Sequence, residues 1–140
     1  MDSSSDHSVS EAQRVAEFRA GLRRFDARTD QAAKDAGLTP QRYLLLVMIK
    51  GAPDGSQSAT VSELSDRLEM PQTTVSDLVA RAQAAGLLRR DQSVRDGRVV
   101  HLRLSDEGER RLALCIRSLQ DDRTELERSL AAASRRLRSL

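Results

Sequence analysis

The sequence contains little aromatic or sulfur chemistry: aromatics make up 2% of its 140 residues, tryptophan is absent, and there is one cysteine. A single cysteine excludes an internal disulfide, and with only two histidines beside it there is no usual structural zinc site. With so few aromatics the core has to consist mainly of Leu, Val and Ala, a composition that favours helices. No apolar run has membrane-spanning length, and the acidic, serine-rich residues 1–10 do not resemble a secretory signal, so we expect a cytoplasmic protein without membrane contact.

Motifs for catalysis and cofactor binding are also missing. The sequence has no nucleophile–base arrangement, no glycine-rich phosphate loop and no cluster of metal ligands. An enzyme is therefore the least favoured class, and no cofactor is expected.

What the sequence does have is a local excess of arginine. The whole chain has a net charge of +2, whereas the segment from Arg81 to Arg103 has six arginines and two aspartates, a local charge of +4. Concentrated positive charge is typical of a surface that binds phosphate. The alternative is that arginine is simply the preferred base of this chain, which has only two lysines.

Apolar residues recur at helical spacing near the N-terminus. Residues 1–9 are expected to form an unstructured tail, after which Ser10 can cap a long helix that Gly37 ends. The apolar stripe of this helix consists of Val15, Phe18, Leu22, Phe25, Ala32 and Ala36. Such a stripe is longer than one small lobe can cover, so part of it is expected to face a partner chain.

The middle of the chain predicts a helix-turn-helix. An apolar run at 43–49 indicates a buried helix, and the capping box Thr60–Glu63 begins another one. The turn Glu69–Pro71 then leads into a helix from about Gln72 to Ala85. In this last helix one face is apolar, with Val75, Leu78, Val79 and Ala82. The opposite face carries Gln72, Thr73, Ser76, Asp77 and Ala80, with Arg81 at its edge.

The short side chains of that second face can act as hydrogen-bond donors and acceptors. A helix that carries them can lie close to base edges in a major groove. An ordinary solvated face is the alternative, but such faces usually favour Glu and Lys, which are absent here.

A β-hairpin is predicted directly after the helix-turn-helix. Alternating residues indicate strands at Leu87–Gln92 and Val99–Leu104, joined by a two-residue turn at Asp96-Gly97. The arginines of this segment include Arg95 and Arg98 at the tip and Arg103 on the return strand. A helix-turn-helix with such a hairpin is a winged helix, whose basic tip can enter the neighbouring minor groove. Asp96 is expected to pair with Arg98 and to hold its guanidinium in place.

The C-terminal part predicts further helices after a cap at Ser105. One stripe consists of Leu112, Ile116 and Leu119; a second, after a loss of register around Gln120–Asp122, consists of Leu126, Leu130, Ala133, Leu137 and Leu140. The predicted fold is therefore mainly α with a small β-hairpin wing. It has a winged helix-turn-helix lobe at 38–104 and a helical dimerisation region formed by 10–37 and 105–140.

Three segments in this order and spacing resemble the MarR family, the multiple antibiotic resistance regulators. They are LTPQRYLLLVMI, TVSELSDRLEMPQTTVSDLVARAQAAGLLRR and RDGRVVHLRLSDEG. The resemblance implies a homodimeric transcriptional regulator, most often a repressor, that binds a pseudo-palindromic operator in double-stranded DNA. It makes Arg98 the minor-groove arginine, Asp96 its partner, and Gln72, Thr73, Thr74 and Ser76 groove-facing residues. Ser62 and Arg90 are expected at the DNA backbone.

Two positions depart from the family pattern. Asp77 stands where the family often has a base, which should weaken phosphate contact or favour a cytosine amino group. Gly97 replaces a residue that is commonly arginine, which removes one positive charge from the wing.

Three alternatives stay open at this stage. The winged helix could serve only protein–protein assembly, although this would not explain its basic tip. Cys115 could make the protein a thiol-based redox sensor, or it could be a small buried hydrophobe. Relatives often bind small anionic aromatic ligands, for which Arg42, Tyr43 and His101 are the candidate lining residues, although their spacing does not demand a pocket.

Overall fold

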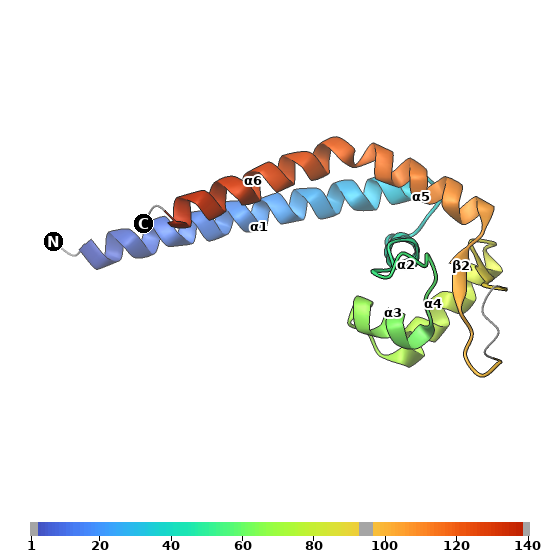
Figure 1. The fold of residues 1–140 in the computed structure, drawn as a ribbon. Coiled ribbons are helices and arrows are strands. Elements are labelled where there is room, and N and C mark those ends of the chain that lie inside the picture. Colours follow the sequence, from blue (N-terminus) through green and yellow to red (C-terminus); the bar gives the residue numbers. More distant parts are fainter. Residues whose placement is uncertain (1–2, 93–96, 139–140) are drawn as a thin grey trace. The chain divides into compact units, whose positions relative to one another are not determined.

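The computed structural model describes residues 3–92 and 97–138, which form six helices and a two-stranded antiparallel hairpin (Figure 1). The elements are α1 Ser3–Asp35, α2 Pro40–Lys50, α3 Val61–Leu68, α4 Gln72–Ala84, β1 Leu88–Arg90, β2 Leu102–Leu104, α5 Asp106–Ser118 and α6 Gln120–Arg138. They divide into two compact units. One unit is Ala33–Arg117, and the other consists of two segments, the residues up to Ala32 and the residues from Ser118 onward. The predicted class, mainly helical with a hairpin wing, is confirmed.

The unit Ala33–Arg117 is built around α2. The Thr39 hydroxyl accepts the N–H of Arg42 at 3.1 Å, and Pro40 begins the helix, as expected of a helix N-terminus. Buried side chains of α2, α3, α4, the hairpin and α5 form one core: they include Leu45, Leu46, Ile49, Leu64, Val75, Val79, Leu87, Leu102, Leu112 and Cys115. Burial of a Leu or Ile side chain contributes about 1.5–3 kcal/mol, so the short helices are stabilised mainly by this core.

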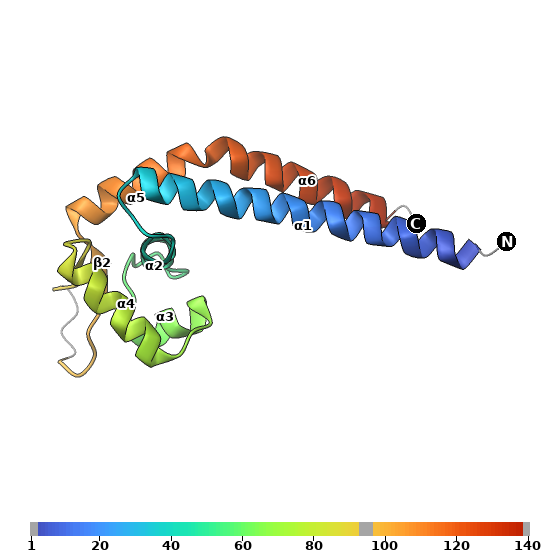
Figure 2. The ribbon, with the colours of Figure 1, turned by 180° about the vertical axis from the view of Figure 1, so that it is seen from behind.

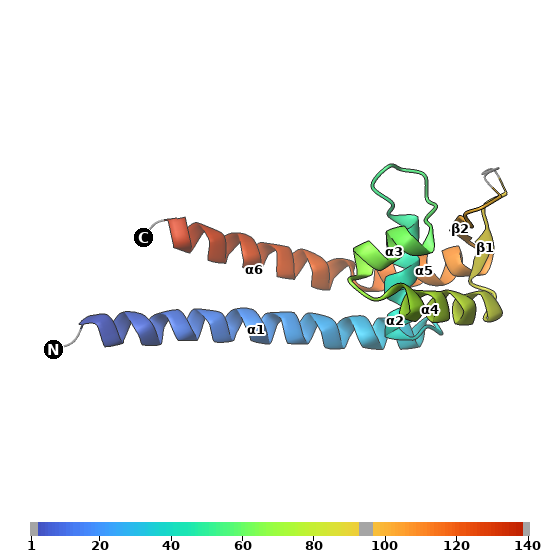
Figure 3. The ribbon, with the colours of Figure 1, turned by 90° about the horizontal axis from the view of Figure 1, so that it is seen from below.

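The three helices α2, α3 and α4 pack against one another, and Figure 2 shows the group from behind. The hairpin packs beside them through β1 on α4 and β2 on α2 (Figure 3). Its register pairs Leu88 with Leu104 and Arg90 with Leu102. On the other side of β2, Ala59 and Leu102 exchange backbone hydrogen bonds of 3.1 and 2.9 Å. The chain before α3 thus anchors the base of the wing.

α1 begins earlier than the sequence predicted. It starts at Ser3, so residues 3–9 are helical instead of forming a tail, and Ser10 lies within the helix and does not cap it. No glycine or proline occurs between Ser3 and Ala20, so nothing in that stretch stops the helix.

α5 belongs to the winged-helix unit, whereas residues 105–140 were expected to lie entirely in the dimerisation region. Leu112 and Cys115 of α5 are buried in the same core as α2. The Lys50 ammonium also donates a hydrogen bond of 2.9 Å to Glu109, joining the end of α2 to α5. Apolar spacing alone gives the same helix whether its stripe packs on its own lobe or on a partner, so the sequence pattern could not distinguish the two.

Candidate nucleic-acid interface

α3 and α4 form the predicted helix-turn-helix. The Thr60 hydroxyl accepts the N–H of Glu63 at 3.2 Å, and the Glu63 carboxylate accepts the N–H of Thr60 at 3.1 Å, which completes the capping box. α3 ends at Glu69, whose φ of 53° turns the chain toward α4. The Ser65 hydroxyl spans this turn by donating to the Met70 carbonyl at 2.5 Å. The turn is therefore held by side-chain bonds as well as by its backbone.

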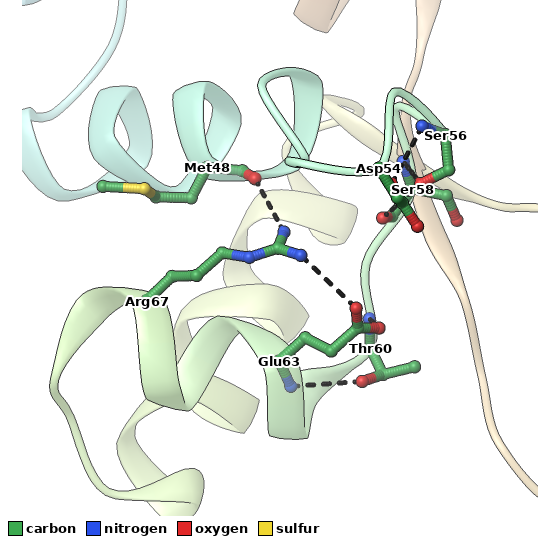
Figure 4. A network of polar contacts seen from close by, with 7 residues as sticks. All are labelled: Met48, Asp54, Ser56, Ser58, Thr60, Glu63 and Arg67. Atoms are coloured by element: carbon green, nitrogen blue, oxygen red, sulfur yellow. Dashed lines mark hydrogen bonds and ion pairs between the residues drawn. The ribbon is translucent and has the colours of Figure 1, made fainter.

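A polar network fixes α3 against α2 (Figure 4). The Arg67 guanidinium donates to the Met48 carbonyl at 3.1 Å and pairs with the Glu63 carboxylate at 3.3 Å. Glu63 therefore caps the start of α3 and also orients the arginine that ties the end of α3 to α2. In the loop before α3, hydrogen bonds from Ser56 hold the pKa of the Asp54 carboxyl below its usual value. These bonds fix the position of α3, against which α4 packs.

α4 has the two faces that the sequence predicted. Its inner side chains Val75, Leu78, Val79 and Ala82 are buried. Its outer side chains Gln72, Thr73, Thr74, Ser76, Asp77, Ala80 and Arg81 are exposed. The outer face therefore presents short polar groups on a rigid helix, a surface that can approach base edges closely.

The charged groups of this face interact with each other, an ion pair that was not predicted from the sequence. The Arg81 guanidinium lies 3.2 Å from the Asp77 carboxylate, and both side chains are largely exposed. The signal was present in the sequence, because an acid followed four residues later by a base is the spacing of a helical ion pair.

The wing is a shorter hairpin than predicted, with strands of three residues each. The pairing continues by one bond, from the Asp91 N–H to the His101 carbonyl at 2.8 Å. Val99 and Val100 lie outside the strands and are 45% and 40% exposed. The predicted turn at Asp96-Gly97 includes Asp96, which lies outside the described residues, so this turn stays a prediction.

Arg103 lies on the return strand β2, as predicted, and its side chain is held at the base of the wing. Its guanidinium donates to the Ser56 carbonyl at 3.1 Å and lies 3.8 Å from the carboxylate of Asp91, whose side chain is only 6% exposed. Arg103 therefore ties the base of the wing to the loop before α3 and compensates a buried acid.

The remaining wing and backbone residues are partly described. Arg95 and Asp96 lie outside the described residues, so the predicted pair between Asp96 and Arg98 is not tested. Arg98 is exposed in the turn that precedes β2, and Arg90 is exposed at the end of β1. Ser62 is exposed in the first turn of α3, where backbone N–H groups favour an anion. The DNA contacts of these residues stay predictions.

The candidate ligand residues lie on different elements. Arg42 and Tyr43 are half-buried in the first turn of α2, and Tyr43 packs on the core, while His101 precedes β2. Two grooves, of about 390 and 190 Å³, lie between α1 and α6. Neither groove is lined by any of these three residues. The structure therefore adds no support for a ligand site at these residues.

Cys115 is fully buried in the core, and burial raises the pKa of its thiol. Because the thiolate is the reactive form, this environment favours the small hydrophobe over the redox sensor. Among the described residues no three His, Cys, Asp or Glu side chains come together as metal ligands. No helix in the described part of the chain is long and apolar enough to cross a membrane.

Known proteins share both the sequence and the architecture of this chain. A model of the MarR family matches residues 36–99. The HTH-type transcriptional repressor MdtR of Bacillus subtilis (strain 168) is 29% identical over 79 residues, a match that covers 56% of this chain and 48% of the repressor. The match thus spans about half the length of that curated relative.

Two solved structures resemble nearly the whole chain. A MarR family protein from Bacillus stearothermophilus is 26% identical, with a TM-score of 0.69 over 99% of this chain and 94% of that one. A mutant MarR from E. coli complexed with operator DNA shares the fold at 18% identity, with a TM-score of 0.67 over 89% of this chain and 90% of that one. Residues 36–99 therefore match the MarR family, whose members are transcriptional regulators and not enzymes, and the chain as a whole shares the fold of solved MarR family proteins.

Proposed function

We propose that this protein is a dimeric, sequence-specific DNA-binding repressor of transcription. The observation that carries the proposal is the exposed face of α4, which presents short polar side chains on a fixed helix-turn-helix. A wing that bears arginine follows it in the chain. Arginine contacts with phosphate position a protein on the duplex, and short polar side chains that reach the base edges recognise its sequence. Repression is favoured because the Bacillus subtilis relative is named a repressor. A ligand that releases DNA is not part of the proposal.

Dimerisation is supported by apolar surface on the unit that contains α1 and α6. Val15 and Phe18 of α1 are 55% and 44% exposed, and Leu130 of α6 is 38% exposed. Phe18 and Leu130 line the larger groove together with Leu126. Exposed apolar surface of this kind marks an interface, and a symmetric dimer places two recognition helices about 34 Å apart, one turn of DNA.

Sedimentation at micromolar concentration tests the dimer. The wild type should sediment as a dimer, and Phe18→Glu should raise the dimer dissociation constant at least about tenfold, because a carboxylate would be buried in the interface. Arg19→Glu is the control, since it introduces the same side chain at the next, exposed position of α1, which does not line the groove. A wild-type chain that stays a folded monomer at this concentration contradicts the proposal.

DNA binding is tested with two variants, one expected to lose affinity for any duplex and the other to lose affinity for the operator alone. Arg98→Ala should weaken binding to an operator and to a scrambled duplex alike, and the salt slope should fall by about 0.9 per lost contact, or about 1.8 for two wings. Gln72→Ala should cost about 1–3 kcal/mol per half-site on the operator and little on the scrambled duplex. Arg128→Ala, which removes an exposed arginine from α6, is the charge control.

The measurement is fluorescence anisotropy over a salt series, with an operator selected from random or genomic DNA. If the wild type selects no sequence and binds no duplex, it is not a DNA-binding regulator, and the winged helix serves assembly instead. If Arg98→Ala behaves like Arg128→Ala on both duplexes, the wing does not engage DNA.

A further inference from the structure

The ion pair between Asp77 and Arg81 is not explained by folding. These are the only charged residues of α4, so the helix has no net charge with which to attract phosphate. Their side chains are 61% and 68% exposed, and an exposed pair of this kind contributes little to stability. The pair lies on the face that also carries Gln72, Thr73 and Ser76. Its placement therefore suits an external partner better than the core.

The pair presents one acceptor and one donor group at a defined spacing. The Asp77 oxygen and the nearest Arg81 nitrogen are 3.2 Å apart. On the major-groove edge of a G·C pair, the cytosine N4 amino group donates while guanine O6 and N7 accept. Cytosine N4 and guanine O6 are hydrogen-bonded to each other, so they lie about 2.9 Å apart. The two spacings match, and donor faces acceptor at both positions.

We propose that the Asp77–Arg81 pair reads one G·C base pair in each half-site, an inference that rests on the proposed DNA-binding function. The Asp77 carboxylate accepts a hydrogen bond from cytosine N4, and the Arg81 guanidinium donates to guanine O6 and N7. Asp77 also repels phosphate, so it holds Arg81 at the base edge and away from the backbone. The pair is thus a specificity-determining element, and its low net charge is part of that role.

An A·T pair does not offer the same pattern. Its adenine amino group stands between the N7 and O4 acceptors, so no two acceptors are adjacent for the two-pronged guanidinium. The thymine methyl group lies beside O4 and crowds the arginine. The other exposed groups of α4 are neutral, so discrimination at this base pair depends on Asp77 and Arg81.

The test is selection of binding sequences from randomised duplexes, followed by affinities for single-base variants. The wild type should select a G·C pair at one position of each half-site, and its replacement by A·T should weaken binding about 5- to 150-fold per half-site. Asp77→Asn should lose most of this preference and gain affinity for A·T, because an amide pairs with adenine N6 and N7. Arg81→Gln should lose the G·C preference as well. Asp121→Asn removes one exposed carboxylate from α6 and should keep the wild-type preference.

Two results would overturn the inference. One is a wild-type operator without such a G·C position; the other is an Asp77→Asn variant that keeps the full G·C preference. In either case selection of an operator through other base pairs would leave the proposed function standing. Absence of binding to every duplex would overturn both.

Discussion

Replacing Gly108 by alanine tests how closely α5 is docked on the winged-helix unit. A Cβ at this position would lie 2.2 Å from the carbonyl oxygen of Leu87, a separation that real Cβ atoms essentially never show. The obstacle is backbone that also accepts the N–H of Ser105 at 2.9 Å. The Gly108 N–H in turn donates to the Ser105 hydroxyl at 3.1 Å. The clash therefore cannot be relieved by rotating a side chain.

The expected cost follows from these contacts. Alanine would favour an isolated helix over glycine by about 1 kcal/mol. Against this, overpacking costs about 1–3 kcal/mol, and moving α5 away weakens the two Ser105 bonds at about 0.5–1.5 kcal/mol each. The net change should be a destabilisation of roughly 1–5 kcal/mol, and Tm should fall by on the order of 10 °C.

Thermal unfolding followed by circular dichroism at one fixed protein concentration measures this change, since the Tm of a dimer depends on concentration. Gly97→Ala is the matched control: its added Cβ would meet nothing within 4 Å, and its φ is not left-handed, so its stability should change by no more than about 0.5 kcal/mol. A Gly108→Ala protein with a Tm equal to or above that of the wild type would refute the reasoning about this contact.

Two further predictions concern α5. Cys115→Ser should reduce stability by about 1–3 kcal/mol, because it places a hydroxyl in the apolar core, and any peroxide response of DNA binding should be the same in the variant; a response that disappears would show a thiol sensor. Hydrogen bonds from Arg110 and Arg111 lower the pKa of Glu107 from 4.5 to about 2. Because the folded-state pKa is depressed, this stabilisation is present above pH 4.5 and is lost as the pH falls toward 2. Glu107→Gln should therefore be less stable than the wild type at neutral pH, with a difference that shrinks over that acid range in denaturant titrations; a difference independent of pH would contradict the assignment.

Local patterns in the sequence were sufficient for the elements that position the candidate interface. The capping box at Thr60–Glu63 and the turn Glu69–Pro71 are formed by neighbouring residues, so each is encoded within a few positions. The helical period likewise separated the buried face of α4, with Val75 and Val79, from its polar face. These features need no knowledge of the rest of the fold, and together with their order they sufficed to indicate the family.

Only the tertiary structure decided which surface each element meets. The apolar stripe of α5 requires burial, but its period does not say whether Leu112 packs on α2 or on a partner chain. Arg103 belongs by sequence to a basic segment, yet its contacts with Asp91 and Ser56 depend on residues far apart in the chain. The contact that requires Gly108 likewise depends on the approach of the Leu87 carbonyl. Periodicity determines what must be buried, whereas the partner of a buried or charged group is set by long-range packing, which a local pattern does not contain.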